Sequence, residues 1–121
     1  MQIDAQKFDV IARTVFAPVY PLLAQQIMER TGVRSGLCLD LGSGGGYLGL
    51  ALAWNSKLRV CLLDESEDMK AIAERTILER QLEHRVLAVQ GDVHRIPLQS
   101  GSVDLVVSRG SIDFWDDLSM V

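Results

Sequence analysis

The chain has 121 residues, enough for one domain or less. Its 48% hydrophobic content is typical of a globular core rather than a disordered segment, and its formal net charge of −4, with acids and bases mixed, offers no basic surface for nucleic acid. The first residues are polar, and no apolar run approaches the ~20 residues of a membrane span. We therefore expect a cytoplasmic protein.

The N-terminal part of the chain predicts two helices separated by prolines. Apolar side chains recur at helical spacing between Ile3 and Phe16, which fits a helix packed on the core or a lid over a ligand equally well. We describe residues 1–20 as an N-terminal helical lid segment. Pro21 suits the first turn of a second helix, and Gly32 is expected to end that helix.

The most informative stretch runs from Leu37 to Leu50. A nearly unbroken apolar run predicts a parallel strand buried on both faces, and the glycines after it allow a tight turn whose N–H groups can approach a ligand. A helix starting at Tyr47 would complete a unit that holds part of a cofactor. Inside this strand, the Asp40 carboxylate either ties the turn together or orients a cationic ligand, and we favour the second role.

Three further strands are expected, in alternation with helices. They cover residues 59–64, 85–90 and 103–108, with an amphipathic helix capped by Ser66 after the first of them. This alternation predicts a parallel sheet with right-handed crossovers. Ligands bind at the carboxyl ends of strands in such sheets. The four strands here end in small residues or acids: Gly42-Ser43-Gly44, Asp64, Asp92 and Ser108.

Two cysteines, Cys38 and Cys61, fall in two of the predicted core strands. Two cysteines alone do not make a zinc site, so we expect buried free thiols in a reducing cytosol. If the two strands are neighbours, the thiols could lie near each other.

The glycines can be interpreted in two frames. Residues 44–49 match G-x-G-x-x-G, and Asp64 lies twenty residues after Gly44, as in a dinucleotide site. The second frame is Asp40-x-Gly42-x-Gly44-x-Gly46, in which Gly49 only serves helix packing. Acids at three strand ends would repel the pyrophosphate of a dinucleotide and would suit a cationic cofactor, which favours the second frame.

In that second frame the sequence resembles the class I S-adenosylmethionine-dependent methyltransferases, particularly the small-molecule type. Four linked segments in the family's order carry the resemblance: Leu39 to Gly46, Leu63 to Met69, Gly91 to Leu98, and Ser102 to Ser108. It implies an α/β fold, a Rossmann-like three-layer sandwich with a mostly parallel sheet of strand order 3-2-1-4. It also implies one partial domain over residues 1–121 that lacks the family's last three strands, so the chain looks truncated at its C-terminus.

The resemblance implies where S-adenosylmethionine, and S-adenosylhomocysteine as product, would bind. Asp40 would help to hold the amino group of the methionine part. Asp64 would accept hydrogen bonds from the ribose hydroxyls, and Asp92 one from the adenine amino group. Ser108 and Arg109 would lie nearest the methyl-transfer position. The expected cofactor-binding residues are Asp40, Gly42, Ser43, Gly44, Gly46, Asp64, Glu65, Ser66, Met69, Gly91, Asp92, Val93, Ser108 and Arg109.

The expected function is methyl transfer from S-adenosylmethionine to a small-molecule acceptor, with no metal and no assigned catalytic base. Two alternatives stay open: a cofactor-binding fragment without turnover, and an NAD-dependent oxidoreductase. We expect neither a nucleic acid nor a membrane partner. By the family's strand order, the fourth strand would be an exposed apolar edge with Leu105, Val106 and Val107, which predicts pairing with a second copy of the chain or aggregation of the isolated chain.

Overall fold

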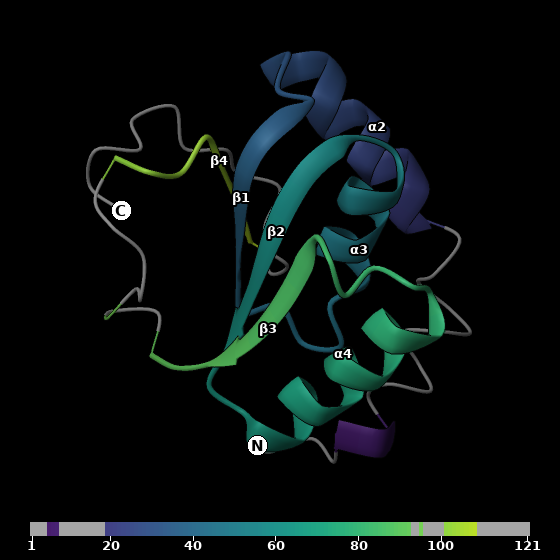
Figure 1. The fold of residues 1–121 in the computed structure, drawn as a ribbon, viewed down its shortest axis with the longest axis vertical. Coiled ribbons are helices and arrows are strands. Elements are labelled where there is room, and N and C mark those ends of the chain that lie inside the picture. The colour runs from purple at the N-terminus through teal and green to yellow at the C-terminus, as the bar shows by residue number, and fades with distance from the viewer. Residues whose placement is uncertain (1–4, 8–18, 93–94, 96–100, 109–121) are drawn as a thin grey trace.

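The computed structural model describes residues 5–7, 19–92, 95 and 101–108. Within these ranges the centre of the molecule is a parallel sheet of order β3-β2-β1-β4 (Figure 1). Its strands are β1 (Ser35–Leu41), β2 (Lys57–Asp64), β3 (Val86–Gln90) and β4 (Leu105–Ser108). The predicted α/β class and the predicted strand order are confirmed.

Three helices cover one face of this sheet (Figure 1). They are α2 (Tyr20–Thr31), α3 (Tyr47–Trp54) and α4 (Glu67–Glu79). The central α3 is buried on every side except at its last residue, because it packs against α2 on one side and against β1 and β2 on the other. Most of the predicted lid over residues 1–20 lies outside the described residues, as does any helical layer on the other face of the sheet.

The helix ends follow the chemistry expected from the sequence. Gly32 ends α2 with a φ of +71° and donates its N–H to the Met28 carbonyl at 2.8 Å. The Ser66 hydroxyl caps α4 by accepting a hydrogen bond from the Met69 N–H at 3.2 Å. Both predicted caps are confirmed. Pro21 lies in the first turn of α2, which begins one residue earlier than expected.

The two cysteines lie in neighbouring strands but on opposite faces of the sheet. Cys38 belongs to the core under the helices, whereas Cys61 pairs with Leu39 in the strand register and lies in the core of the other face. The two thiols therefore lie on different faces, because side chains alternate along a strand. Burial raises the pKa of the Cys38 thiol well above its ordinary value, and the Asp40 charge raises it further.

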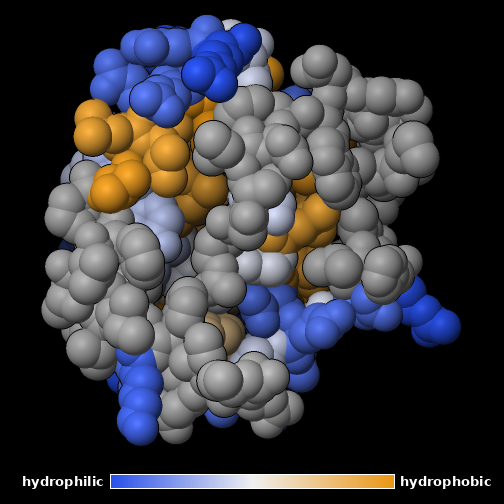
Figure 2. All heavy atoms as spheres, turned by 180° about the vertical axis from the view of Figure 1, so that it is seen from behind, coloured by the Kyte–Doolittle hydropathy of each residue, from blue (hydrophilic) through white to orange (hydrophobic). Residues whose placement is uncertain are grey.

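The described surface carries several large hydrophobic side chains. Val19 and Leu22 at the start of α2 and Trp54 at the end of α3 are exposed, as is Leu87 on β3. In the view from behind, a patch of hydrophobic residues lies directly beside a patch of strongly hydrophilic residues (Figure 2). None of the helices within the described ranges is long and apolar enough to cross a membrane.

Candidate cofactor site

The carboxyl ends of the strands meet at one edge of the sheet. In the parallel register Leu41 of β1 lies beside Leu63 of β2 and Ser108 of β4, and Asp64 of β2 lies beside Gln90 of β3. The residues that follow each strand therefore emerge next to one another. This convergence was predicted from the alternation of strands and helices, and it is the usual place for a ligand in a parallel sheet.

A tight turn joins β1 to α3. The Ser43 N–H donates to the Leu63 carbonyl at 3.1 Å, and the Gly46 N–H donates back to the Ser43 carbonyl at 2.9 Å. Gly42, Gly44 and Gly46 have φ values of +63°, +58° and +84°, in the left-handed region that favours glycine. The alternate glycines of the Asp40-x-Gly42-x-Gly44-x-Gly46 frame are thus the ones whose backbone conformation requires glycine.

Gly46 and Gly49 in this segment also allow close packing. A Cβ on Gly46 would lie 2.5 Å from the Leu62 Cδ1, and a Cβ on Gly49 would collide with the other methyl group of Leu62. These contacts let α3 approach β2, so the prediction that Gly49 serves helix packing is confirmed. At Gly42, by contrast, a Cβ would meet nothing within 4 Å, so the backbone there faces open space.

Asp40 is fully buried at the end of β1. Its Oδ2 accepts a hydrogen bond at 3.2 Å from the N–H of Gly49, in the first turn of α3. The carboxylate therefore ties α3 to β1, a structural role like the less favoured alternative, except that its donor is a helix N–H and not one in the turn. Its expected contact with the amino group of a ligand stays a prediction, and its depth in the core argues for an indirect role.

Asp64 holds the same turn from the end of β2. Its Oδ2 accepts from the Gly44 N–H at 2.8 Å, and its Oδ1 accepts from the Ser66 N–H at 2.8 Å. The Asp64 carbonyl also accepts from the Gly91 N–H at 2.9 Å, which connects the turn to the end of β3. The side chain is only partly buried, so it stands between the protein backbone and solvent.

The residues expected around an adenine ring lie beyond Asp64 along the same edge. Asp92 is exposed just after β3, and its carbonyl accepts from the Arg95 N–H at 2.9 Å. Glu65 is exposed, and its carbonyl accepts from the Gln90 side chain at 3.2 Å. The structure thus brings the acids at 64, 65 and 92 to one edge. The predicted site residue Val93 lies outside the described residues.

Two other predicted residues are half-buried at this end of the sheet. Met69 lies in the first turn of α4, and Ser108 is the last residue of β4. Ser108 pairs with Leu41, directly before the glycine turn, which agrees with its expected place near the transferred group. Arg109 lies outside the described residues.

Two residues with clear supporting roles were not predicted. The Asp104 carboxylate accepts from the Leu37 N–H at 2.9 Å and so joins the segment before β4 to β1. The Arg85 guanidinium donates to the carbonyls of Ala53, Ser56 and Leu58 at 2.8, 3.0 and 3.3 Å, which fixes the connection from α3 to β2. Their partners lie 67 residues and 27 to 32 residues away, so no local pattern reveals them.

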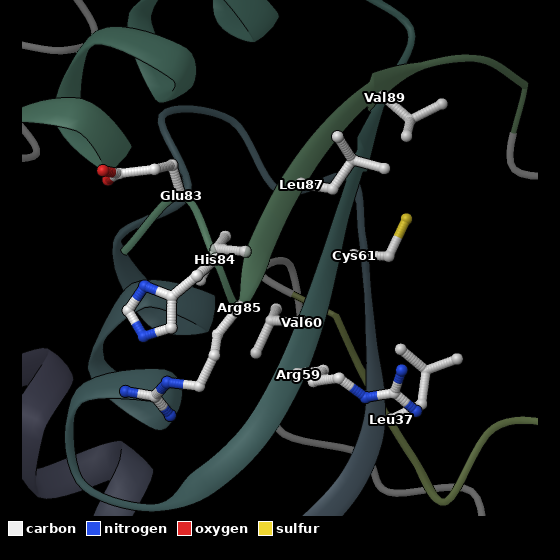
Figure 3. A pocket seen from close by; sticks show the side chains of 10 residues that line it. Leu37, Arg59, Val60, Cys61, Glu83, His84, Arg85, Leu87 and Val89 are labelled. Atoms are coloured by element: carbon white, nitrogen blue, oxygen red, sulfur yellow. The ribbon is translucent and has the colours of Figure 1, made fainter. Parts of the chain in front are cut away.

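A separate hollow of about 400 Å³ lies on β1, β2 and β3 (Figure 3). Apolar side chains such as Leu37, Cys61 and Leu87 line it, together with Arg59 and His84. None of the residues predicted to bind a cofactor lines this hollow, and it is therefore not the predicted site. Within the described ranges, no group of three or more His, Cys, Asp or Glu residues is placed to hold a metal ion.

Comparison with known proteins identifies the family of the chain that carries this site. Residues 38–121 match the model of a family described as a methyltransferase domain, and the chain belongs to that family. The matched range includes the glycine turn, Asp64 and Asp92. The frame that joins Asp40 to alternate glycines is thereby preferred to the dinucleotide frame.

Individual relatives agree with the family. The chain is 34% identical to the malonyl-[acyl-carrier protein] O-methyltransferase of Methylovorus sp. (strain MP688), over 93% of this chain and 41% of that protein. A solved "putative S-adenosyl-L-methionine-dependent methyltransferase" of Methanococcus maripaludis is 42% identical, with a TM-score of 0.86 over 98% of this chain and 57% of that one. The [4+2]-cyclase SpnF is 29% identical, with a TM-score of 0.65 over 71% of this chain and 32% of that one. The chain therefore spans about half, or less, of the length of these relatives.

Proposed function

We propose that this chain binds S-adenosylmethionine at the carboxyl ends of its strands, and that the protein transfers the methyl group to a small-molecule acceptor. The observation that carries the proposal is the glycine turn over residues 42–46, with Asp64 bonded to it and Asp92 on the same edge of the sheet. Membership of the methyltransferase domain family and the names of two relatives support the same function.

The chemistry of these residues suits that cofactor. S-adenosylmethionine presents cationic and hydroxyl groups, and the carboxylates of Asp64 and Asp92 are acceptors of hydrogen bonds that also offset positive charge. Asp64 is partly exposed and Asp92 is exposed, which leaves both within reach of a ligand. The open space at Gly42 would let the cofactor approach the backbone of the turn.

When bound, the cofactor supplies a methyl carbon activated by a positively charged sulfur. The task of the protein is then to align this carbon with the acceptor and to exclude water. The turn at 42–46 would fix the methionine part, Asp64 the ribose, and Asp92 the adenine. Ser108 at the end of β4 would border the acceptor, and no residue of the chain is assigned as a base.

We further propose a cytoplasmic location and no nucleic acid partner, in line with the free thiols and the net charge of −4. Among the described strands β4 pairs only with β1, but Leu105, Val106 and Val107 of β4 are buried, so the expected exposure of these apolar side chains is wrong. Self-association through the other edge of β4 is part of the proposal. Sedimentation of the purified chain over a range of concentrations tests it, and a folded monomer at every concentration would count against it.

Calorimetry on the purified chain tests the cofactor assignment. Binding of S-adenosylmethionine and S-adenosylhomocysteine, without binding of NAD, is the expected result. Asp92→Ala should weaken S-adenosylhomocysteine binding by about tenfold, because a buried or ordered hydrogen bond to a charged group is worth about 1.5 kcal/mol or more. Glu83→Ala, an exposed acid beyond the predicted site, is the matched control. Binding of NAD alone would instead favour the oxidoreductase alternative.

A second candidate function is cofactor binding without turnover by this chain alone. The chain spans 41% of its curated relative, and SpnF shows that a relative named as a cyclase shares this fold. A methyl-transfer assay that compares this chain with a longer form of the protein separates the candidates. Equal binding in both forms, with transfer only in the longer one, would assign this chain to binding.

A further inference from the structure

The hydrogen bonds of Asp64 point to a second task for this residue. Its two carboxylate oxygens each accept a backbone N–H at 2.8 Å, one from Gly44 inside the glycine turn and one from Ser66 before α4. Short bonds from N–H groups to a carboxylate are among the stronger hydrogen bonds in proteins.

The glycine turn needs such support. Its left-handed residues are glycines, which lose more conformational freedom on ordering than any other residue type. On one side the turn is held by its own backbone bond from Gly46 to Ser43 and by the bond from Ser43 to Leu63. Gly44, at the middle of the turn, donates its N–H to Asp64.

We propose that Asp64 is a positioning residue that sets the shape of the glycine turn before the cofactor arrives, in addition to accepting the ribose hydroxyls. This inference rests on the proposed function for its ligand. A carboxylate can perform both tasks because each oxygen has two lone pairs, of which the backbone N–H uses one. An asparagine cannot, since one of its two terminal atoms is a donor that would face an N–H.

Amide hydrogen exchange in the cofactor-free protein tests the positioning role without any ligand. In Asp64→Ala the Gly44 amide should exchange about tenfold faster or more than in the wild type, because its charged acceptor is removed. Asp68→Ala, at an exposed acid in the first turn of α4, removes the same charge four residues away and should leave the Gly44 rate unchanged. The Val60 amide, which donates to the Arg85 carbonyl inside the sheet, reports that each variant is folded. Equal Gly44 rates in all three proteins would overturn the proposal.

A ligand without ribose hydroxyls separates the two tasks of Asp64. If Asp64 only recognises the ribose, Asp64→Ala will weaken the binding of S-adenosylhomocysteine and leave that of its 2′,3′-dideoxy analogue unaffected, which would overturn the positioning role. If Asp64 also shapes the turn, the variant will bind the dideoxy analogue several-fold more weakly than the wild type does. Should the wild type bind neither ligand, the proposed function would fail, while the exchange rates of Gly44 would still decide the positioning role.

Discussion

The ends of β1 and β2 each carry an aspartate, and the two residues are used differently. Asp40 is fully buried and bonds to the Gly49 N–H inside α3, whereas Asp64 is partly exposed and bonds to Gly44 and Ser66 in the loops. The strand register explains the difference. Leu41 lies beside Leu63, so Asp64 stands one step beyond the end of β1, while Asp40 stands one step inside it. A shift of two positions along the sheet thus separates a core anchor from a residue that can meet a ligand.

The sharpest way to break this comparison is to remove the buried acid. Asp40→Ala should lower the free energy of unfolding by about 3 kcal/mol, because it leaves the buried Gly49 N–H without its acceptor and opens a cavity in the core. Chemical denaturation measures the loss. Glu83→Ala, on the surface, should change the same quantity by less than about 0.5 kcal/mol. If denaturation shows a loss of less than about 1 kcal/mol for Asp40→Ala, Asp40 is not an anchor of α3.

The packing beside Asp40 can be tested at Gly49. Gly49→Ala should cost about 2 kcal/mol of stability, because the added Cβ collides with the Leu62 side chain and lies 3.1 Å from the Asp40 Oδ2. Leu62→Ala removes the colliding methyl groups. The double variant should therefore lose less stability than the sum of the two single losses. Strict additivity of the two changes would contradict the close contact between α3 and β2.

The open side of the turn should respond differently to the same kind of change. Gly42→Ala meets no atom within 4 Å, so its cost comes only from the left-handed backbone and should be about 1.5 kcal/mol. We expect it to reduce S-adenosylhomocysteine affinity as well, since the new methyl group occupies space next to the turn. Parallel denaturation and calorimetry give the two numbers. Unchanged affinity would place the cofactor away from Gly42.

The smallest expected effect concerns Cys38, which lies in β1 two residues before Asp40. Its pKa is raised in the folded state, chiefly by burial, so the folded protein resists ionisation of this thiol. Below about pH 8.5 the thiol is neutral in both states; above it only the unfolded state ionises, and stability falls as the pH rises. The loss should be about 0.8 kcal/mol at pH 9. Denaturation at pH 7 and pH 9 should show a smaller decrease for Cys38→Ala than for the wild type.

Much of the fold could be predicted because local sequence patterns indicate its strands, its helix ends and its topology. Apolar runs mark the strands, Gly32 and Ser66 mark helix ends, and the order of strands and helices implies a parallel sheet. The strand ends could also be predicted to meet at one site. These inferences need only neighbouring residues and general rules of chain topology.

The depth and the partners of individual side chains could not be predicted. Asp40 lies one residue inside its apolar run and Asp64 ends its own, but the partners and the depth of the two carboxylates follow only from the register between β1 and β2. The same register places Cys38 and Cys61 on opposite faces. Arg85 and Asp104 bond across the fold to distant residues, and such pairs leave no trace in a single sequence.

The most direct test of the central claim is an NMR titration of the chain with S-adenosylhomocysteine. If the cofactor binds at the carboxyl ends of the strands, the largest shifts will fall on the amides of residues 42–46, 64–66 and 91–92. Amides at the other end of the sheet, such as those of Gly36 and Leu58, should barely move. Shifts concentrated instead around Arg59 and Leu87, in the hollow of Figure 3, would contradict the assignment of the site.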